Sequence, residues 1–328
     1  MKVGARAALR EPVLSLLARP RQADIAAGLD KQVAGVLELQ RRMKLPSLDT
    51  MDPVAARAFI EDGLSLLEVD SVAMAHVTDG RIPHAGSRHT DDVIPVRIFE
   101  PRNASPHWLV YFHGGGGVVG SAKGSERTTR LIADLTRCTV ASVDYRLGPE
   151  HKHPAAIEDA IRAASALRER IPRGGKLVVG GDSFGGFLAA HVARVLHVDA
   201  QLLIYPITDL TLRSPGFTTH GEGFLYTKAI AAYFKHHYLN ADDDREAASL
   251  ASWPDLAGAA PAIVVTAGFD PLCPEGDAHA ARLAAVTRVV HRRYPSLVHS
   301  FLSLAGGVRA ARAAIDEMCQ DLCELLAP

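Results

Sequence analysis

The stretch Gly181-Asp182-Ser183-Phe184-Gly185 decides the fold of this chain. Residues 176–180, directly before it, are mostly apolar and β-branched, which predicts a buried strand. The segment from Phe184 to Leu196 predicts a helix with Val195 on its buried face. A serine between glycines at a strand-to-helix turn is typical of a nucleophile elbow, where small neighbours keep strand and helix from colliding and the serine is strained. Ser183 is therefore a candidate nucleophile; the alternative is a glycine-rich turn whose serine caps the helix.

Composition excludes several classes of protein. The 328 residues are 48% hydrophobic, and 36 basic residues balance 37 acidic ones to a net charge of −1. We therefore expect no nucleic-acid partner, and no apolar run has the roughly 18 residues of a stable membrane span. The four cysteines form no CxxC pair, so we expect reduced thiols and a cytoplasmic location.

Strands and helices alternate along most of the chain, which predicts one α/β domain over residues 1–328 with a doubly wound, mostly parallel sheet. We expect strands at 69–78, 93–100, 108–112, 139–145, 177–180, 202–205, 262–267 and 288–294. We expect helices at 24–43, 53–67, 125–137, 155–170, 184–196 and 227–239.

Two segments depart from this alternation. Residues from 1 to about 68 read as helices without a strand, and residues from about 207 to about 258 form a long insertion with one aromatic helix. Insertions of that length are usually functional, so we expect the two segments to form a helical cap. Within the first 20 residues an amphipathic helix is favoured over a targeting segment.

A serine nucleophile needs a base, an acid that orients the base, and donors for the oxyanion. Such groups lie at the carboxyl ends of the strands in open α/β sheets. Asp270 follows the strand at 262–267, and His299 follows the last strand. The order Ser183, Asp270, His299 is that of a nucleophile-elbow triad. The alternatives for the acid are Asp255 and Asp277, or Asp270 is a turn cap.

The oxyanion donors should come from the backbone N–H of Phe184 and from the loop after an earlier strand. The loop His113-Gly114-Gly115-Gly116-Gly117 lets the backbone approach a substrate closely. We expect His113 to be a structural hydrogen-bonding residue and not the base.

The glycines also allow a different interpretation. Gly115 to Gly120 matches the G-x-G-x-x-G fingerprint, and Asp144 ends the next strand, where a ribose-binding acid would lie. A dinucleotide-binding oxidoreductase is therefore an alternative, although the next helix should begin only near Ser125. His151-Lys152-His153 and His236-His237 lack metal-ligand spacing, so we expect no metal.

Taken together, the motifs resemble those of the hormone-sensitive-lipase-like (family IV) carboxylesterases of the α/β-hydrolase superfamily. The resemblance implies the α/β-hydrolase fold with a helical cap, a Ser183-His299-Asp270 triad, and oxyanion donors at Gly115, Gly116 and Phe184, with no cofactor. The matching segments are 113–116 with His113 and Gly114, 145–150, 153–159, 181–186 with Asp182, 270–276 and 299–301.

The chain departs from the family pattern near the nucleophile. Gly117 stands where an aromatic residue is usual, and Phe184 stands where alanine is usual. The hypothesis is that Gly117 vacates pocket volume that Phe184 partly refills, which changes chain-length preference. We also expect Phe224 and Tyr233 to line the substrate pocket.

The resemblance implies a serine carboxylesterase that hydrolyses short- to medium-chain acyl esters through an acyl-enzyme. The alternatives are a lipase acting on longer-chain acylglycerols and a non-catalytic ligand-binding member. The expected partner is a small-molecule ester, and the sequence is compatible with a homodimer.

Overall fold

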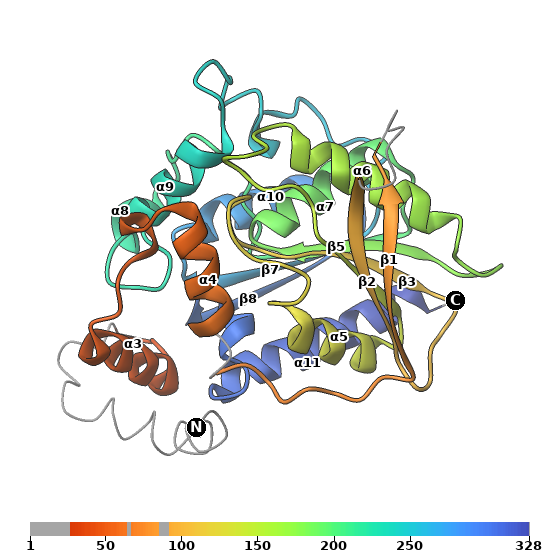
Figure 1. Cartoon of the computed structure of the whole chain (residues 1–328), viewed down its shortest axis with the longest axis horizontal. Coiled ribbons are helices and arrows are strands. Elements are labelled where there is room, and N and C mark those ends of the chain that lie inside the picture. Colours follow the sequence, from red (N-terminus) through yellow and green to blue (C-terminus); the bar gives the residue numbers. More distant parts are fainter. Residues whose placement is uncertain (1–26, 64–66, 85–91, 328) are drawn as a thin grey trace.

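The computed structural model describes residues 27–63, 67–84 and 92–327. A central sheet is covered by helices on both faces, and the helices α3, α4, α8 and α9 gather at one side of the molecule (Figure 1). The predicted helix over residues 1–20 lies outside the described residues.

Eight strands form one sheet in the order β1-β2-β4-β3-β5-β6-β7-β8. β2 runs antiparallel to both of its neighbours and the other five strand pairs are parallel, so the mostly parallel sheet that the sequence predicts is confirmed. The strands are β1 (His76–Pro83), β2 (Val93–Glu100), β3 (Trp108–Phe112), β4 (Thr139–Val143), β5 (Leu177–Asp182), β6 (Ala200–Ile204), β7 (Ala262–Phe269) and β8 (Val289–Val298).

The helices lie in two layers and in two segments outside them. Helices α5 and α11 cover one face of the sheet, and α6, α7 and α10 cover the other (Figure 1). The α-helices are α3 (Lys31–Met43), α4 (Pro53–Gly63), α5 (Glu126–Thr136), α6 (Ala155–Arg168), α7 (Phe184–Val195), α8 (Gly216–Thr219), α9 (Lys228–Tyr238), α10 (Cys273–Ala284) and α11 (Arg309–Leu326). The short 3₁₀ helices within the described residues are η2 (Leu48–Thr50), η4 (Leu250–Ser252) and η5 (Phe301–Leu304).

The strand order reverses between β3 and β5. The chain leaves β3 toward β4 on one side, and leaves β5 toward β6 on the other. Loops that diverge in this way leave a crevice at the carboxyl ends of the two strands. The loop at 113–120 and the Ser183 turn both start at this switch point.

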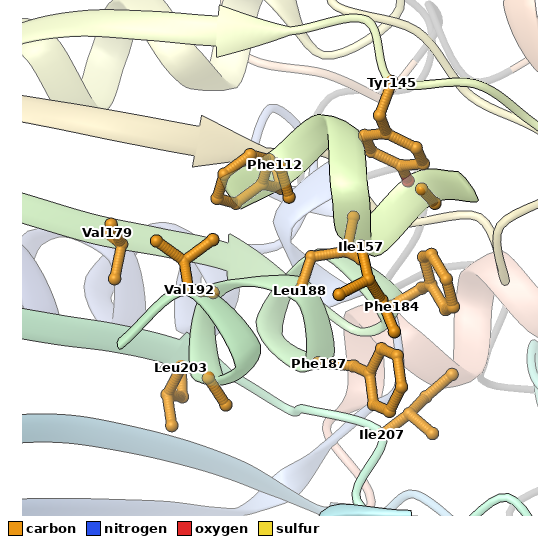
Figure 2. Packing of buried hydrophobic residues seen from close by; sticks show 14 of the residues in the cluster. Phe112, Tyr145, Ile157, Val179, Phe184, Phe187, Leu188, Val192, Leu203 and Ile207 are labelled. Atoms are coloured by element: carbon orange, nitrogen blue, oxygen red, sulfur yellow. The ribbon is translucent and has the colours of Figure 1, made fainter. Parts of the chain in front are cut away.

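Helix α7 holds the elbow against the sheet through apolar packing. Its residues Leu188 and Val192 belong to one buried cluster with Val179 and Leu203 of the strands beneath (Figure 2). The prediction that Val195 lies on this buried face is wrong. Val195 is the last residue of the helix and is 61% exposed.

Another prediction differs from the structure near the N-terminus. Strand β1 begins at His76 and not at 69, and it runs through Asp79 and Gly80 to Pro83. The helix predicted from residue 53 does start there, because the Asp52 carboxylate accepts hydrogen bonds from the N–H groups of Val54 and Ala55. It ends at Gly63.

Candidate active site

The turn at Ser183 is as tight as its sequence predicts. Ser183 has φ 54° and ψ −114°, a strained conformation for a residue with a side chain. A Cβ atom on Gly181 or Gly185 would overlap the carbonyl oxygen of Phe112 on the neighbouring strand. The glycines are therefore needed for the close approach of β3 to the turn, which leaves Ser183 at the start of α7.

Three predicted residues meet at the carboxyl ends of β5, β7 and β8. The Oγ of Ser183 lies 2.9 Å from Nε2 of His299, and Nδ1 of His299 lies 2.7 Å from Oδ2 of Asp270. All three side chains are buried. The N–H of Leu272 donates to the other carboxylate oxygen of Asp270, which fixes the orientation of the acid.

A bulge in β8 brings the histidine to this position. Ala267 pairs with Tyr294, yet Phe269 pairs with Val298, so β8 contains two more residues than β7 over the same span. Such a bulge bends the strand and re-aims the residues that follow it. His299 comes directly after the strand, and Ser300 at φ 62° turns the chain into η5.

The loop after β3 lies next to the Ser183 turn, because β3 pairs with β5. Gly115, Gly116 and Gly117 have φ values of 116°, 63° and 73°, which favour glycine. Within the part of the chain that the structure describes, the N–H groups of Gly115 and Gly116 have no hydrogen-bond acceptor. Phe184 is the first residue of α7, where an N–H has no intrahelical partner.

Asp182 ties this loop to the elbow. Its Oδ1 accepts hydrogen bonds from the Tyr111 hydroxyl at 2.8 Å and from the Gly114 N–H at 3.0 Å. Burial raises the pKa of Asp182. His113 stacks on Tyr145 with ring centroids 4.4 Å apart, and the Tyr145 hydroxyl donates to the His113 carbonyl. Burial lowers the pKa of His113, which favours the neutral ring of a structural residue.

Aromatic rings fill the space beside the glycines. A Cβ atom on Gly117 would lie 2.8 Å from Cζ of Phe184 and 2.8 Å from Cδ2 of Tyr238. A Cβ atom on Gly116 would overlap the Phe234 ring of α9. The family's usual aromatic residue therefore has no room at position 117 while Phe184 and Tyr238 stay in place.

The other two predicted pocket residues make different contacts. The Tyr233 ring lies 4.5 Å from His237 and 5.7 Å from Phe234, both on its own helix. Phe224 packs on Phe269, with ring centroids 5.5 Å apart. On α9, the Phe234 ring instead lies against Gly116.

Sequence reasoning missed two rings that enclose the imidazole. Tyr205, which follows β6, and Tyr226, in the insertion, have ring centroids 4.8 Å and 4.5 Å from that of His299. Neither tyrosine belongs to a motif, and Tyr226 lies 73 residues before His299 in a loop, so no local signal in the sequence identifies it.

The glycine loop does not form a dinucleotide fingerprint. Helix α5 begins at Glu126, six residues beyond Gly120, whereas the fingerprint needs a helix that starts among the glycines. The Asp144 carboxylate, the candidate ribose ligand, accepts a hydrogen bond from the Ala122 N–H at 2.6 Å. The start of the loop instead bonds to Asp182, the residue before Ser183.

Two features are absent from the described residues. None of them form a group of three or more His, Cys, Asp or Glu side chains that could hold a metal ion. Among the same residues, every helix is too short or too polar to cross a membrane.

Comparisons with known proteins agree with this geometry. A family model described as the alpha/beta hydrolase fold matches residues 109–303, more than half of the chain. The carboxylic ester hydrolase LipN of Mycobacterium tuberculosis is 35% identical over 311 residues, covering 80% of each chain. The ethyl acetate hydrolase of Pseudomonas putida is 31% identical over 236 residues, covering 66% of this chain and 74% of the relative.

A solved structure is similar over nearly the whole length. An α/β hydrolase from the metagenome of Lake Arreo, Spain, superposes with a TM-score of 0.84 at 32% identity, covering 90% of this chain and 97% of that one. The fold and the relatives together confirm the resemblance that the motifs indicate. The chain therefore belongs to the α/β-hydrolase family, as a hormone-sensitive-lipase-like carboxylic ester hydrolase.

Proposed function

We propose that the chain is a serine carboxylesterase in which Ser183, His299 and Asp270 form the catalytic triad. The observation that carries the proposal is the continuous line of short contacts from Ser183 Oγ to His299 Nε2, and from His299 Nδ1 to Asp270. This is the arrangement that lets a serine act as a nucleophile at neutral pH.

In the proposed reaction, Nε2 of His299 takes the proton of the Ser183 hydroxyl as Oγ bonds to the ester carbonyl carbon. Asp270 accepts the Nδ1–H of His299 and stabilises the imidazolium. The tetrahedral intermediate collapses as the bond to the alcohol oxygen breaks, and the alcohol leaves with the proton from Nε2. A water molecule then attacks the acyl-enzyme in the same way and releases the acid.

The N–H groups of Gly115, Gly116 and Phe184 are the proposed donors to the oxyanion. The absence of another acceptor for the two glycines in the described structure supports this role. The loss of one such donor typically costs roughly 2.7–4 kcal/mol of transition-state stabilisation. We propose that His113, Gly114 and Asp182 hold the donor loop in place through their hydrogen bonds.

The proposed substrates are short- to medium-chain acyl esters. Support comes from the rings of Phe184, Phe234 and Tyr238, which occupy the space around Gly116 and Gly117. A relative named for ethyl acetate hydrolysis is consistent with a small acyl group. A chain-length series of p-nitrophenyl esters tests this point, and a maximum at long chains would favour the lipase alternative.

The remaining proposals concern the cap, the cellular location and the oligomeric state. We propose that residues from 1 to about 68 and from about 207 to about 258 form the cap, with Phe234 as its contact to the oxyanion glycines. All four cysteines are free thiols, which supports a reducing, cytoplasmic location. A homodimer stays a proposal that sedimentation analysis tests.

The decisive experiment replaces the nucleophile. Ser183→Ala should lower the rate constant for ester hydrolysis by about 10⁴–10⁶ and abolish labelling by a fluorophosphonate probe. Ser142→Ala, at a buried serine on β4, is the matched control and should keep both. Turnover or labelling that survives in the Ser183 variant would refute the assignment, and a wild-type protein that is never labelled would favour a ligand-binding member.

A further inference from the structure

Arg57 of helix α4 reaches from the N-terminal helices to the base of the glycine loop. Its Nε donates to the Val118 carbonyl at 2.8 Å, and its Nη2 donates to the Gly148 carbonyl at 2.8 Å. The same guanidinium makes a two-pronged pair with the Glu150 carboxylate at 2.9 and 2.6 Å. These bonds lower the pKa of Glu150 to about 2. One planar side chain thus contacts two separate loops of the core.

Both of these loops hold the oxyanion glycines. The N–H groups of Val118 and Val119 donate to the Gly115 carbonyl at 3.0 Å each. The Gly148 N–H donates to the Gly117 carbonyl at 2.8 Å. Arg57 therefore contacts the residues that fix each end of the Gly115–Gly117 turn.

The turn needs such external restraint. Three successive glycines with positive φ have little intrinsic preference for one conformation, and each loses much freedom when it is fixed. The Asp182 carboxylate holds the start of the loop through the Gly114 N–H. Val118 holds Gly115 and Gly148 holds Gly117, and Arg57 bonds to both Val118 and Gly148.

We propose that Arg57 is a positioning residue for the oxyanion hole. The inference rests on the proposed function. Preorganised donors stabilise the charge that develops in the transition state, and they lose this effect when they are displaced. Arg57 bonds to the carbonyls of Val118 and Gly148, so its removal should loosen the donors and weaken transition-state binding much more than ground-state binding.

The exposure of the pair argues against a role in global stability alone. The side chains of Arg57 and Glu150 are 27% and 49% exposed, and exposed ion pairs contribute little to the stability of a fold. A variant at Arg57 should therefore stay folded while its catalysis changes. This difference distinguishes a positioning residue from a residue that only stabilises the fold.

The test compares Arg57→Gln with Arg41→Gln. Arg41 makes a similar two-pronged pair with Glu38 but lies on α3, with no contact to the loop. For Arg57→Gln we expect kcat on p-nitrophenyl acetate to fall about 10- to 100-fold, somewhat less than for the loss of a donor itself. KM should change by less than about threefold, as for an interaction made only in the transition state.

A second readout addresses the oxyanion hole directly. A trifluoromethyl ketone adds to the serine as a tetrahedral adduct whose oxyanion occupies the hole. Its affinity should fall in parallel with kcat in Arg57→Gln and stay unchanged in Arg41→Gln. Arg57→Lys keeps the charge without the planar fork, so it should recover only part of the loss. Glu150→Gln leaves both carbonyl contacts and should have the smaller effect.

Three results would overturn the inference. One is an Arg57→Gln enzyme whose kcat and ketone affinity match those of Arg41→Gln. Another is a fall in kcat with unchanged ketone affinity. The third is a loss of activity in Arg57→Lys and Glu150→Gln that a lower Tm explains fully. This third test can be made even if Arg57→Gln does not fold. Wild-type turnover that depends on Ser183 would keep the proposed function intact in each case.

Discussion

The ring of Tyr226 lies over the imidazole of His299, with centroids 4.5 Å apart and planes 30° from parallel. Tyr226 is buried and comes from the insertion, whereas His299 follows the last strand of the core. The proposed mechanism turns the imidazole into an imidazolium, and an aromatic face stabilises a cation while it keeps water away. Part of the environment of the proposed base is therefore supplied by the insertion.

Replacement of Tyr226 should test this contribution. Tyr226→Leu should lower kcat/KM by about tenfold, because a desolvated aromatic–cation contact is worth about 1–2 kcal/mol. Tyr226→Phe keeps the ring and should stay close to the wild type. The measurement is kcat/KM on a short-chain ester for both variants. A Phe variant as poor as the Leu variant would assign the effect to the hydroxyl.

The ring of Phe184 should limit the acyl chain. Phe184→Leu vacates space beside Gly117 but keeps the backbone N–H, so preference among p-nitrophenyl esters should move toward longer chains. Phe187→Leu is the control, because Phe187 stacks on Phe184 at 5.3 Å and is likewise buried. Both variants should lose about 1 kcal/mol of stability, but only the first should alter the chain-length profile. Equal profiles would contradict this role.

Gly117→Phe offers the converse test of the same hypothesis. At φ 73°, with Phe184 and Tyr238 in contact range, a new aromatic side chain should destabilise the loop and lower activity on every ester. The added change Phe184→Ala should recover part of that activity because it removes one of the two clashes. The measurement is a double-mutant comparison of kcat/KM, and simple additivity of the two losses would argue against shared space.

Asp182 should affect the reaction through the loop and not through direct chemistry. Asp182→Ala removes the acceptor of the Gly114 N–H and of the Tyr111 hydroxyl, so it should cost about 1–3 kcal/mol of stability. Its kcat should also fall, since the donors lose their support. Tyr111→Phe leaves the bond to Gly114 and should keep kcat near the wild-type value. A similar fall in both variants would mean that the hydroxyl matters as much as the loop contact.

Buried His279 should make the fold sensitive to acid. Burial lowers its pKa from 6.5 to about 4, and its Nδ1 has no hydrogen-bond partner among the described residues. A folded-state pKa below the unfolded value gives stability that is present above pH 6.5 and is lost as the pH falls toward 4. The full loss is about 3 kcal/mol.

The acid sensitivity can be measured by denaturant unfolding at pH 7.5, 6 and 5. His279→Leu should flatten the fall in the free energy of unfolding over this range. His151→Gln, at an exposed histidine, is the control and should leave the slope unchanged. An unaltered slope in His279→Leu would show that other groups cause the acid sensitivity.

Much of the architecture is readable from the sequence because its signals are local. Strands β2 and β3 have the predicted bounds, since buried apolar runs end at clear turn residues. Each predicted triad member follows a strand, and the parallel strands β5, β7 and β8 place these residues at the same edge of the sheet. The contact between Ser183 and His299 follows from chain order and topology.

Strand β1 shows where local signals fail. The apolar residues from Val69 onward form no ladder there; the side chains of Arg127 and Arg130 donate to the carbonyls of Val69 and Val72 instead. Asp79 and Gly80 lie beyond the predicted end of the strand at residue 78, yet they continue it because an edge strand tolerates polar residues. Both outcomes depend on partners that are distant in the sequence.

The aromatic surroundings of His299 and the Arg57 contacts could not be predicted for the same reason. Tyr226 and Arg57 come from segments without a motif, and each meets its partner only after the insertion and the N-terminal helices pack on the core. A sequence pattern fixes which residues can react. It does not identify the distant side chains that restrain them.

The position of strand β8 at the edge of the sheet has a consequence for how the site responds to heat. Among the described strands it pairs only with β7, and its bulge lies just before His299. Ser183 is attached to β5, which is paired on both sides deep within the sheet. Heat should therefore loosen the edge before the centre, so that activity is lost at temperatures where most of the protein is still folded and recovers on cooling.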